Sequence, residues 1–522
     1  MDAGKLVNTP DSILNELLEL RTKVYAEGLQ TFRGWYPGIR RLSFIPSALN
    51  LSFYLALRRR DLRELQRELK PLGLSSLGLS EAGAIANLDA VIASLACIVG
   101  RQAETGIRRP DPERFYKGEW SLDRQTKLVL GPKPPGRKVR IMVTLSNQCA
   151  TDYSLVRQLL ASGMNVARIN CAHDEQAIWA AMVGNVRQAE RDLGTPCEVI
   201  MELAGPKIRI DAVLSAGESN EVVSENLILL TNNVSLINRF SQIGENVVAA
   251  ISCNWPEALA CLQVGDSVHI DDGKITSVVE AILPEGLLLK VLATAKLKPV
   301  KLKVGKGLHL HCSQLKLPPV TEKDRQDLDF IVTVADAVGF SYVRKADDIA
   351  VLQEELFQRM DNNSVWLPIV AKIETADAIN NLAEIIVRAA SRSPFALMIA
   401  RGDLAMEVGY ERLAELQEEI LWISEAAHVP VIWATQVLES LVKFGTPSRA
   451  EISDAAMSER AECVMLNKGP FIVEAVVLLD NVLSRMDAHQ QKKSPRLRAL
   501  TIAGSGELSL PGGQRPQVEG SN

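Results

Sequence analysis

The chain has few of the features that mark exported, membrane-bound or nucleic-acid-binding proteins. Aromatic residues make up 5% of its 522 residues, and the formal net charge is only −5. This weakly acidic balance offers no basic field for nucleic acid or an anionic membrane. No stretch approaches the roughly 20 consecutive apolar residues of a membrane-spanning helix. The N-terminal residues MDAGKLVNTPDSIL lack the basic and apolar segments of an export signal.

Clustered cysteines are also missing, because the eight cysteines are scattered singly and form no CxxC pair. This spacing argues against a zinc cluster or a disulfide framework and favours a reducing compartment. We therefore expect the cytoplasm, with the plastid stroma as the alternative. The balance of 47% hydrophobic against 23% charged residues is typical of a globular protein with a large core and small-molecule partners.

Both ends of the chain differ from its centre in composition and in the spacing of apolar residues. Residues 1–120 carry helical patterning, including ALRRRDLRELQRELK with leucines at three- and four-residue spacing, and predict a helical N-terminal domain of unknown role. A linker is assigned to 121–138, where LVLGPKPPGRK is rich in proline, glycine and lysine. The Gly/Pro/Ser-rich tail, 491–522, is predicted to be disordered.

The centre alternates short apolar runs with amphipathic helical stretches. The runs are VRIMVTLS (139–146), NVARIN (165–170), EVIMEL (198–203), AVGFSYV (337–343), WLPIVAK (366–372), ALMIAR (396–401), PVIWAT (430–435) and ECVMLN (462–467). Such a series predicts an α/β fold, a (β/α)8 TIM barrel spanning 139–210 and 307–490. Between its halves, 211–306 shows strand-like alternation and turn signals, which predict an inserted all-β lid domain.

Polar residues close several of these runs at the strand ends, where barrel enzymes carry their chemistry. They are Arg168 and Asn170 after the second run, Glu202 after the third, Lys372 and Glu374 after the fifth, Arg401 and Asp403 after the sixth, and Thr435 after the seventh. Burial of one unpaired charge costs on the order of several kcal/mol. A ring of charges therefore implies mutual pairing, a metal or an anionic ligand.

Two of these residues have the chemistry of magnesium ligands. Glu374 and Asp403 are hard oxygen donors on neighbouring strands and would leave positions for water and substrate. Lys372 beside them suits stabilisation of an enolate or a transferring phosphoryl group. For any single one of these residues, a structural salt bridge at the barrel mouth is as good an explanation as a functional role. For the whole set, the structural explanation is much weaker.

Three other motifs carry less weight. The tripeptide Arg401-Gly402-Asp403 matches an adhesion motif, but it follows a buried run and is discarded as chance. His309 and His311 share one face of a strand, yet no third ligand is evident and ordinary polar roles are favoured. Asp271-Asp272-Gly273 is interpreted as a hairpin turn in preference to a metal site.

A set of ordered segments resembles the pyruvate kinase family over about residues 138–486. The segments are SGMNVARINCAH, MELAGPKIR, VGDSVHIDDGKI, LPPVTEKDRQDLDF, VAKIETADAINN, MIARGDLAMEVG, VIWATQVLESLVKFGTPSRAEISDAA and AECVML. The resemblance implies a barrel with a β lid inserted after the third strand. It also implies transfer of the phosphoryl group of phosphoenolpyruvate to ADP, giving pyruvate and ATP.

The resemblance further implies a role for each site residue. Arg168 would bind the phosphoryl group, and Lys372 would stabilise the charge passing between the substrates. Glu374 and Asp403 would hold Mg²⁺, with Mn²⁺ as the alternative. The backbone around Arg401, Gly402 and Asp403 would bind the substrate carboxylate. Thr435 would assist protonation of the enolate. The side chains that would lie toward the nucleotide phosphates are Asn170, His173 and Arg209.

The chain departs from the family where many members bind a monovalent cation. At the four positions that carry Asn, Ser, Asp and Thr in those members, this chain has Asn170, Ala172, Glu202 and Leu203. Two side-chain oxygens are lost, and Lys207 stands where potassium-dependent members have glutamate. Because a tethered ammonium can replace the charge of a bound cation, we expect K⁺ not to be required.

Other departures leave alternatives open. TLSNQCA follows the first run, ISCNWPEALA has no evident lid lysine, and LNKGPFIVEAV follows the eighth run. The family's regulatory C-terminal domain is missing, so activation by a sugar bisphosphate is not expected and a homo-oligomer is left open. The alternatives to a kinase are a catalytically degenerate binding or regulatory protein and a Mg²⁺-dependent oxoacid lyase.

Overall fold

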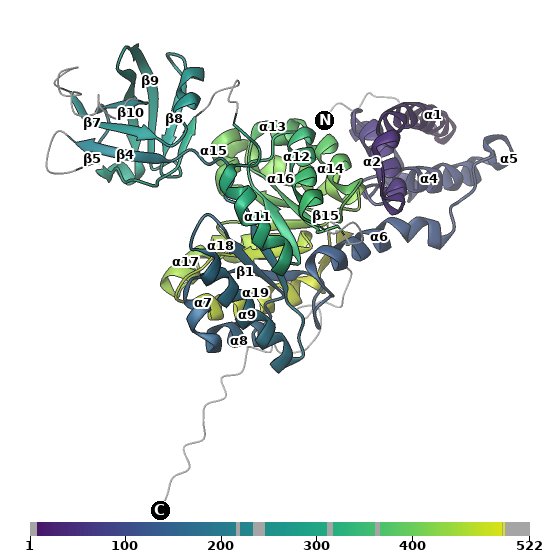
Figure 1. Ribbon diagram of the computed structural model, residues 1–522. Helices are drawn as coiled ribbons and strands as arrows, with labels where there is room; N and C mark the ends of the chain where they lie inside the picture. Colours follow the sequence, from purple (N-terminus) through teal and green to yellow (C-terminus); the bar gives the residue numbers. More distant parts are fainter. Residues whose placement is uncertain are drawn as a thin grey trace, which may run out of the picture.

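The computed structural model describes residues 8–215, 220–232, 246–310, 317–360, 366–492 and 494–495. Within these ranges the chain forms a helical N-terminal region, a closed barrel, and a β domain that stands off one end of the barrel (Figure 1). No helix in the described ranges combines the length and the apolar character needed to cross a bilayer.

The barrel is closed by eight parallel strands in the described part of the chain. They are β1 (Arg140–Thr144), β2 (Val166–Asn170), β3 (Glu198–Glu202), β13 (Ala337–Phe340), β14 (Ile369–Ile373), β15 (Phe395–Ala400), β16 (Val431–Ala434) and β17 (Cys463–Leu466). All six residues of β15 are buried, because one face meets the barrel interior and the other meets helices. The predicted TIM-barrel fold is confirmed.

Helices cover the outside of the barrel and turn their apolar faces toward the strands. The longer ones are α8 (Tyr153–Ala161), α9 (Gln176–Leu193), α11 (Glu322–Val334), α12 (Ala346–Arg359), α14 (Leu382–Ala390), α16 (Tyr410–Ala426), α18 (Arg449–Met457) and α19 (Ile472–Asp487). The short α7 (Gln148–Thr151), α13 (Ala376–Asn380), α15 (Arg401–Val408) and α17 (Glu439–Phe444) follow strands. In α14, Leu382, Ile385, Ile386 and Ala389 are buried at the three- and four-residue spacing of one helix face.

The lid is built on a sheet that contains seven strands in the described ranges, in the order β12-β8-β9-β10-β6-β7-β4. Their bounds are β4 (Ile210–Ser215), β6 (Leu227–Thr231), β7 (Val247–Cys253), β8 (Ser267–Ile270), β9 (Ile275–Leu283), β10 (Gly286–Thr294) and β12 (Leu308–Leu310). The short β5 (Glu221–Val222) and β11 (Val300–Lys301) pair separately. β12 pairs antiparallel with β8, so the predicted lid boundary at residue 306 is too early, and His309 belongs to the lid.

Among the residues that the structure describes, six cysteines are free, namely Cys97, Cys149, Cys171, Cys197, Cys253 and Cys463. Cys261 in the lid is disulfide-bonded, so the expectation that the scattered cysteines stay unpaired is wrong at this position. Cysteine spacing alone does not reveal which positions the fold of the lid brings together.

The N-terminal region is helical, as predicted, and reaches the barrel through its last helix. Its helices are α1 (Pro10–Trp35), α2 (Ile45–Arg58), α3 (Arg63–Leu69), α4 (Ala84–Val99), α5 (Gln102–Thr105) and α6 (Pro112–Leu130). The linker assigned to 121–138 is therefore half helix. The last turn of α6 stays helical because it buries Val129 and Leu130 against residues of the barrel interior such as Met142 and Val370.

Polar contacts attach α2 to the barrel helix α16. Asn50 donates from Nδ2 to the carbonyl of Ala426 at 2.9 Å, and the Arg58 guanidinium lies 4.6 Å from the Trp422 ring centroid. The Arg58 contact is a cation–π interaction with the Trp422 ring. The N-terminal helices are therefore packed onto the barrel by specific contacts.

The beginning of the C-terminal tail is also ordered. The pair β18 (Gln490–Gln491) and β19 (Ser494–Pro495) is antiparallel, and Lys492 between them forms an ion pair with Glu462. The prediction of disorder from residue 491 is therefore wrong for this first turn, which the barrel carboxylate holds. Residues 493 and 496–522 lie outside the described ranges.

Truncating Leu130 is expected to destabilise the protein by about 2–5 kcal/mol, since Leu130→Ala opens a cavity among side chains that fill the barrel. Leu130 is fully buried, whereas Leu128 in the same helix is 49% exposed and serves as the matched control. Urea unfolding of both alanine variants measures the difference. Equal losses of unfolding free energy would contradict the placement of α6 against the barrel interior.

Acidification is expected to weaken the contact between the N-terminal helices and the barrel. His428 joins them, because its Nδ1 lies 2.9 Å from Ser47 Oγ and its Nε2 donates to the Ala82 carbonyl at 3.0 Å. Burial lowers the pKa of His428 from 6.5 to about 4. The neutral imidazole therefore stabilises the fold above pH 6.5, and this contribution is lost as the pH falls toward 4.

The loss should reach on the order of 3 kcal/mol, since one pKa unit corresponds to about 1.4 kcal/mol. Urea unfolding across this pH range should show a steeper decline in stability for the wild type than for His428→Gln. Parallel pH profiles for the two proteins would refute this role of His428.

Candidate active site

A cavity of about 230 Å³ opens at the carboxyl end of the barrel strands. It brings together nine of the twelve residues proposed from the sequence, namely Arg168, Asn170, His173, Glu202, Lys207, Arg209, Lys372, Asp403 and Thr435. Glu374 lines a smaller adjoining cavity, of about 80 Å³, between the barrel and the lid. Asp403 and Lys207 line both cavities.

Arg168 and Glu202 form a buried, two-pronged ion pair at the ends of β2 and β3. Arg168 donates from Nε to Glu202 Oε2 at 2.7 Å and from Nη2 to Oε1 at 2.6 Å. Its Nη1 donates to Thr144 Oγ1 at 2.8 Å. In the pairing of β2 with β3, Arg168 lies beside Ile200, two residues before Glu202. The long arginine side chain can therefore reach the carboxylate on the neighbouring strand. The pair holds the guanidinium in a fixed plane at the cavity wall.

Lys372, on β14, lies between two carboxylates. Its Nζ is 3.2 Å from Glu202 Oε1 and 2.6 Å from Glu374 Oε1. Burial would lower the pKa of Lys372, but these two glutamates outweigh it and raise that pKa. Burial would likewise raise the pKa of Glu202, but Arg168 and Lys372 bring it down to about 2. Lys372 is therefore a permanent positive charge directed into the cavity.

Glu374 and Asp403 provide the carboxylates that a magnesium ion would need. Glu374 is 1% exposed, and its Oε2 accepts a hydrogen bond from the Tyr342 backbone N–H at 2.7 Å. Burial raises the pKa of Glu374, and Asp403 adds to this effect, which shows that the two carboxylates repel each other. Two carboxylates facing one cavity are a donor set that fits Mg²⁺.

Asp403 sits in the first turn of α15, which begins directly after β15. Burial would raise the pKa of Asp403, but Lys207, Lys372 and His309 together lower it. The Lys207 ammonium lies 3.3 Å from Asp403 Oδ1. Lys207 thus contacts a proposed metal ligand and also faces the cavity that contains Asn170, Ala172 and Glu202.

Arg401 does not reach into either cavity with its side chain. Its Nε donates to the Ala434 carbonyl at 3.0 Å, and its Nη2 donates to the Thr435 carbonyl at 2.6 Å and to Asp454 Oδ2 at 2.9 Å. The guanidinium also lies 4.9 Å from the Trp433 ring centroid. These contacts fix the start of α15, so Arg401 can serve a substrate through the backbone that it positions.

The backbone around Gly402 is tied to Thr435. The Gly402 N–H donates to Thr435 Oγ1 at 2.8 Å, and Thr435 has a left-handed φ of 64°. Tyr342, at the end of β13, is also left-handed, with φ of 58°. Non-glycine residues in this conformation are uncommon and gather at functional sites. Both strained residues lie at the barrel mouth.

Asn170, His173 and Arg209 line one side of the larger cavity. Asn170 Oδ1 accepts from the Ala172 N–H at 3.0 Å, and Arg209 Nη1 donates to the Gly305 carbonyl at 2.9 Å. Burial, Lys468 and Arg209 lower the pKa of His173. This side of the cavity is therefore positively charged, as binding of nucleotide phosphates would require.

Four polar cavity residues that follow barrel strands were not singled out from the sequence. Ser341 and Tyr342 follow β13, and Asn467 and Lys468 follow β17. The first pair stands inside the run AVGFSYV, where the polar residues at its end gave a signal that could have been used. Ser341 Oγ lies 3.3 Å from Lys372 Nζ and donates to the Leu203 carbonyl at 2.9 Å, so it positions the lysine.

The chain is therefore a (β/α)8-barrel protein with an inserted lid and with a cavity at the strand ends that is lined by both cationic and acidic side chains. The pyruvate kinase barrel-domain model matches residues 136–476, and the chain belongs to this family. The match starts within the segment after α6 and ends within α19. It therefore includes all eight barrel strands and the lid.

Known relatives are similar over the same region. The chain is 28% identical over 399 residues to pyruvate kinase PKLR of Rattus norvegicus, covering 73% of this chain and 66% of the relative. It is 29% identical over 364 residues to a pyruvate kinase of Agrobacterium vitis, covering 68% and 70%. The chain thus spans slightly less than two thirds of the length of the rat protein. A solved pyruvate kinase from Cryptosporidium parvum shares 26% identity with a TM-score of 0.59, covering 69% of this chain and 72% of that one.

Proposed function

We propose that this chain is a Mg²⁺-dependent pyruvate kinase that transfers the phosphoryl group of phosphoenolpyruvate to ADP, giving pyruvate and ATP. The observation that carries the proposal is the Lys372 ammonium between Glu202 and Glu374, with Arg168 and Asp403 beside them. Phosphoryl transfer depends on positioning and on neutralisation of charge. A fixed cation among metal-binding carboxylates supports both.

In the proposed reaction an oxygen of the ADP β-phosphate attacks phosphorus, and the bond from phosphorus to the enol oxygen breaks. Arg168 would orient the phosphoryl group, and Lys372 would stabilise the negative charge as it passes to the enolate oxygen. Mg²⁺, when bound by Glu374 and Asp403, would neutralise further charge on these oxygens. The enolate carbon then takes a proton, assisted by Thr435, to give pyruvate.

A second candidate, a degenerate binding protein, is favoured by the altered segment after β1. There the residues Gln148–Thr151 form the short helix α7. Titration of ADP into the chain with and without Mg²⁺ separates the two. A kinase should bind ADP more tightly with Mg²⁺ and turn over once phosphoenolpyruvate is added. Absence of ADP binding, together with Mg²⁺-dependent binding of oxalate, would refute the kinase proposal.

The proposed chemistry should not require K⁺. Of the four positions compared above, Ala172 and Leu203 supply no side-chain oxygen, and the Glu202 carboxylate is engaged by Arg168 and Lys372. Lys207 faces the same cavity and would supply the missing positive charge. Turnover in tetramethylammonium buffer should change by less than about twofold, equivalent to ~0.4 kcal/mol, when K⁺ is added. Activity that appears only with K⁺ would exclude this role.

The Lys207→Met variant tests whether the Lys207 ammonium takes the place of a bound K⁺ ion. Its turnover should be low without K⁺, and added K⁺ should restore part of it if the ion can replace the ammonium. Lys301, an exposed residue of β11 in the lid, offers a matched control as Lys301→Met. Six described cysteines are free and one, Cys261, is disulfide-bonded, and on this balance we further propose a cytoplasmic compartment, with the plastid stroma as the alternative. Assembly as a homo-oligomer is compatible with the proposal.

A further inference from the structure

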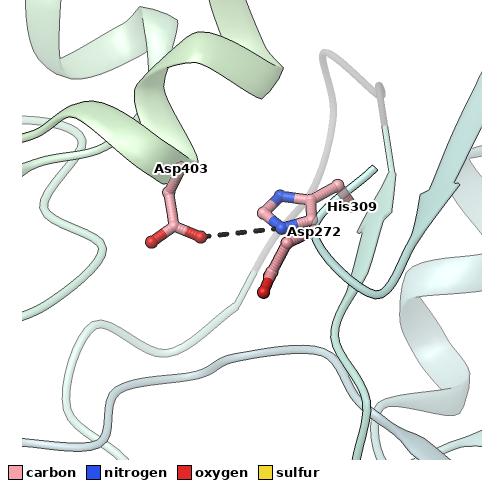
Figure 2. Close-up of side chains that lie close together, drawn as sticks. All are labelled: Asp272, His309 and Asp403. Carbon is pink, nitrogen blue, oxygen red and sulfur yellow. Dashed lines mark ion pairs between the residues drawn. The ribbon is translucent and has the colours of Figure 1, made fainter. Parts of the chain in front are cut away.

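The lid and the barrel place three metal-binding side chains at one point of contact. Asp272 lies in the turn between β8 and β9, His309 lies on β12, and Asp403 lies in the first turn of α15. Figure 2 shows the His309 ring beside Asp272, with the Asp403 carboxylate facing the ring from the barrel. One ligand atom from each residue lies within 4.8 Å of the other two. His309 Nε2 and Asp403 Oδ1 are 3.6 Å apart.

The fold of the lid accounts for the meeting of Asp272 and His309. The register of β12 with β8 pairs Leu308 with Ile270, so His309 runs alongside the strand that enters the turn. The Asp271 N–H donates to the Gly307 carbonyl at 3.0 Å, which ties the turn to the residue before β12. Asp271 itself is neutralised by Lys274 and Lys306, each at 2.9 Å. Asp272 is the next residue of the turn.

The backbone of the turn at residues 271–273 contacts a side chain of the barrel helix α15. Asp271, Asp272 and Gly273 all have left-handed φ values, of 54°, 53° and 80°. A Cβ at Gly273 would lie 2.6 Å from the Cε of Met406 in α15, so the backbone of the turn lies against the end of the Met406 side chain. The helix that carries Asp403 is therefore the surface on which the turn rests.

We propose that Asp272, His309 and Asp403 bind a divalent transition-metal ion of the Mn²⁺ to Zn²⁺ series, which joins the lid to the barrel. Two carboxylates and one imidazole are a mixed oxygen and nitrogen donor set, and imidazole favours these ions over Mg²⁺. The inference rests on the proposed function only because Asp403 is shared with the magnesium site, where Glu374 is the other ligand.

The distances fit such an ion after a small contraction. Ligand atoms at about 2.1 Å from one metal cannot be more than about 4.2 Å apart. The 3.6 Å between His309 and Asp403 already meets this limit. Because the other pairs of ligand atoms lie within 4.8 Å of each other, binding would require a shift of at most about half an ångström.

Lys207 competes with the ion for Asp403. Its ammonium lies 3.3 Å from the same Oδ1 that faces His309. A divalent cation bound there displaces the ammonium or takes the other carboxylate oxygen, because two cations repel each other at this separation. Asp403 is therefore paired with the Lys207 ammonium in one state, and in the other it binds a metal ion that is also held by the lid.

The test is titration of Co²⁺ into the chelator-treated full chain without substrates, followed by calorimetry and by the visible absorption of bound Co²⁺. His309→Asn should weaken Co²⁺ binding by at least about tenfold, since even changes around a ligand cost 10–100-fold. The variant should also shift the Co²⁺ absorption, since a nitrogen donor is lost. Mg²⁺ binding should be unchanged within the error of the titration.

Asp272→Asn is the second variant, and it keeps the fold because asparagine tolerates the left-handed conformation. It should weaken Co²⁺ binding as well, and it decides the test if His309→Asn fails to fold. His269→Asn is the matched control. His269 pairs with His309 across the two strands, but its ring lies by Thr276 and it is outside the cluster. This variant should bind Co²⁺ like the wild type.

Equal Co²⁺ affinity and unchanged absorption in His309→Asn and Asp272→Asn would overturn the metal bridge. Pyruvate formation with Mg²⁺ alone is measured in parallel and keeps the two proposals apart. Turnover without His309-dependent Co²⁺ binding rejects the bridge and leaves the kinase. Co²⁺ binding that depends on His309 and Asp272, in a chain without turnover, supports the bridge and rejects the kinase.

Discussion

Lys372→Met is expected to lower the turnover of phosphoenolpyruvate and ADP by about 10³-fold, because removal of one preorganised charge-stabilising group costs 10²–10³-fold or more. The ammonium is held 3.2 Å from Glu202 and 2.6 Å from Glu374, so no reorganisation is needed as charge develops on the enolate. Coupled pyruvate formation at saturating substrates and Mg²⁺ measures the effect. Methionine keeps most of the volume of the lysine stem.

The matched control is Lys443→Met, which removes a lysine that is 51% exposed and paired with Glu439 on α17. Its turnover should equal that of the wild type. Near-ultraviolet circular dichroism of Lys372→Met is needed as well, because the variant leaves Glu374 buried without its cation. A folded Lys372→Met protein with more than about a tenth of wild-type turnover, a loss below ~1.4 kcal/mol, would contradict the role of Lys372.

Arg168→Met is expected to destabilise the protein by about 3–5 kcal/mol, the range measured when one partner of a buried ion pair is removed. The Glu202 carboxylate is 2% exposed and would keep only Lys372 as a counter-ion. Urea unfolding at neutral pH measures the loss. Because Arg168→Met/Glu202→Leu removes both charges, it should recover most of the stability. A loss below about 1 kcal/mol in the single variant would show that the pair is not energetically coupled.

The same pair gives the wild type a defined pH dependence. Burial would raise the pKa of Glu202, but Arg168 and Lys372 lower it from 4.5 to about 2. The stability that the ionised carboxylate contributes is therefore fully present above pH 4.5 and is lost as the pH falls toward 2. The double variant should lack this component of the acid-unfolding profile.

The barrel could be predicted from the sequence because its strands are buried on both faces. The predicted run 396–401 is displaced by one residue from β15, Phe395–Ala400. The predicted run 430–435 extends one residue beyond each end of β16, Val431–Ala434. Continuous apolar runs separated by helices leave few other folds. The end of α6 was missed because its helical state depends on burial of Val129 and Leu130 under the barrel, which LVLGPKPPGRK does not reveal.

The site could be predicted as a set of strand ends but not as a set of contacts. Lys372, Glu374 and Asp403 are evident because charges directly after buried strands need partners. The outward turn of Arg401 is not evident, because its partner Asp454 lies 53 residues further along the chain. The proximity of His309 and Asp272 to Asp403 could not be predicted either, because Asp403 belongs to the barrel whereas the other two residues belong to the lid. His311 lies outside the described residues.

Phosphorus NMR of phosphoenolpyruvate and ADP with the purified chain and Mg²⁺, without K⁺, tests the account most directly. We expect the phosphoenolpyruvate resonance to fall while the γ-phosphate resonance of ATP rises by the same amount. Asp403→Ala, which removes a proposed metal ligand, should show neither change. Failure of the wild type to form ATP, while it still binds oxalate in a Mg²⁺-dependent manner, would contradict phosphoryl transfer and leave only the enolpyruvate pocket.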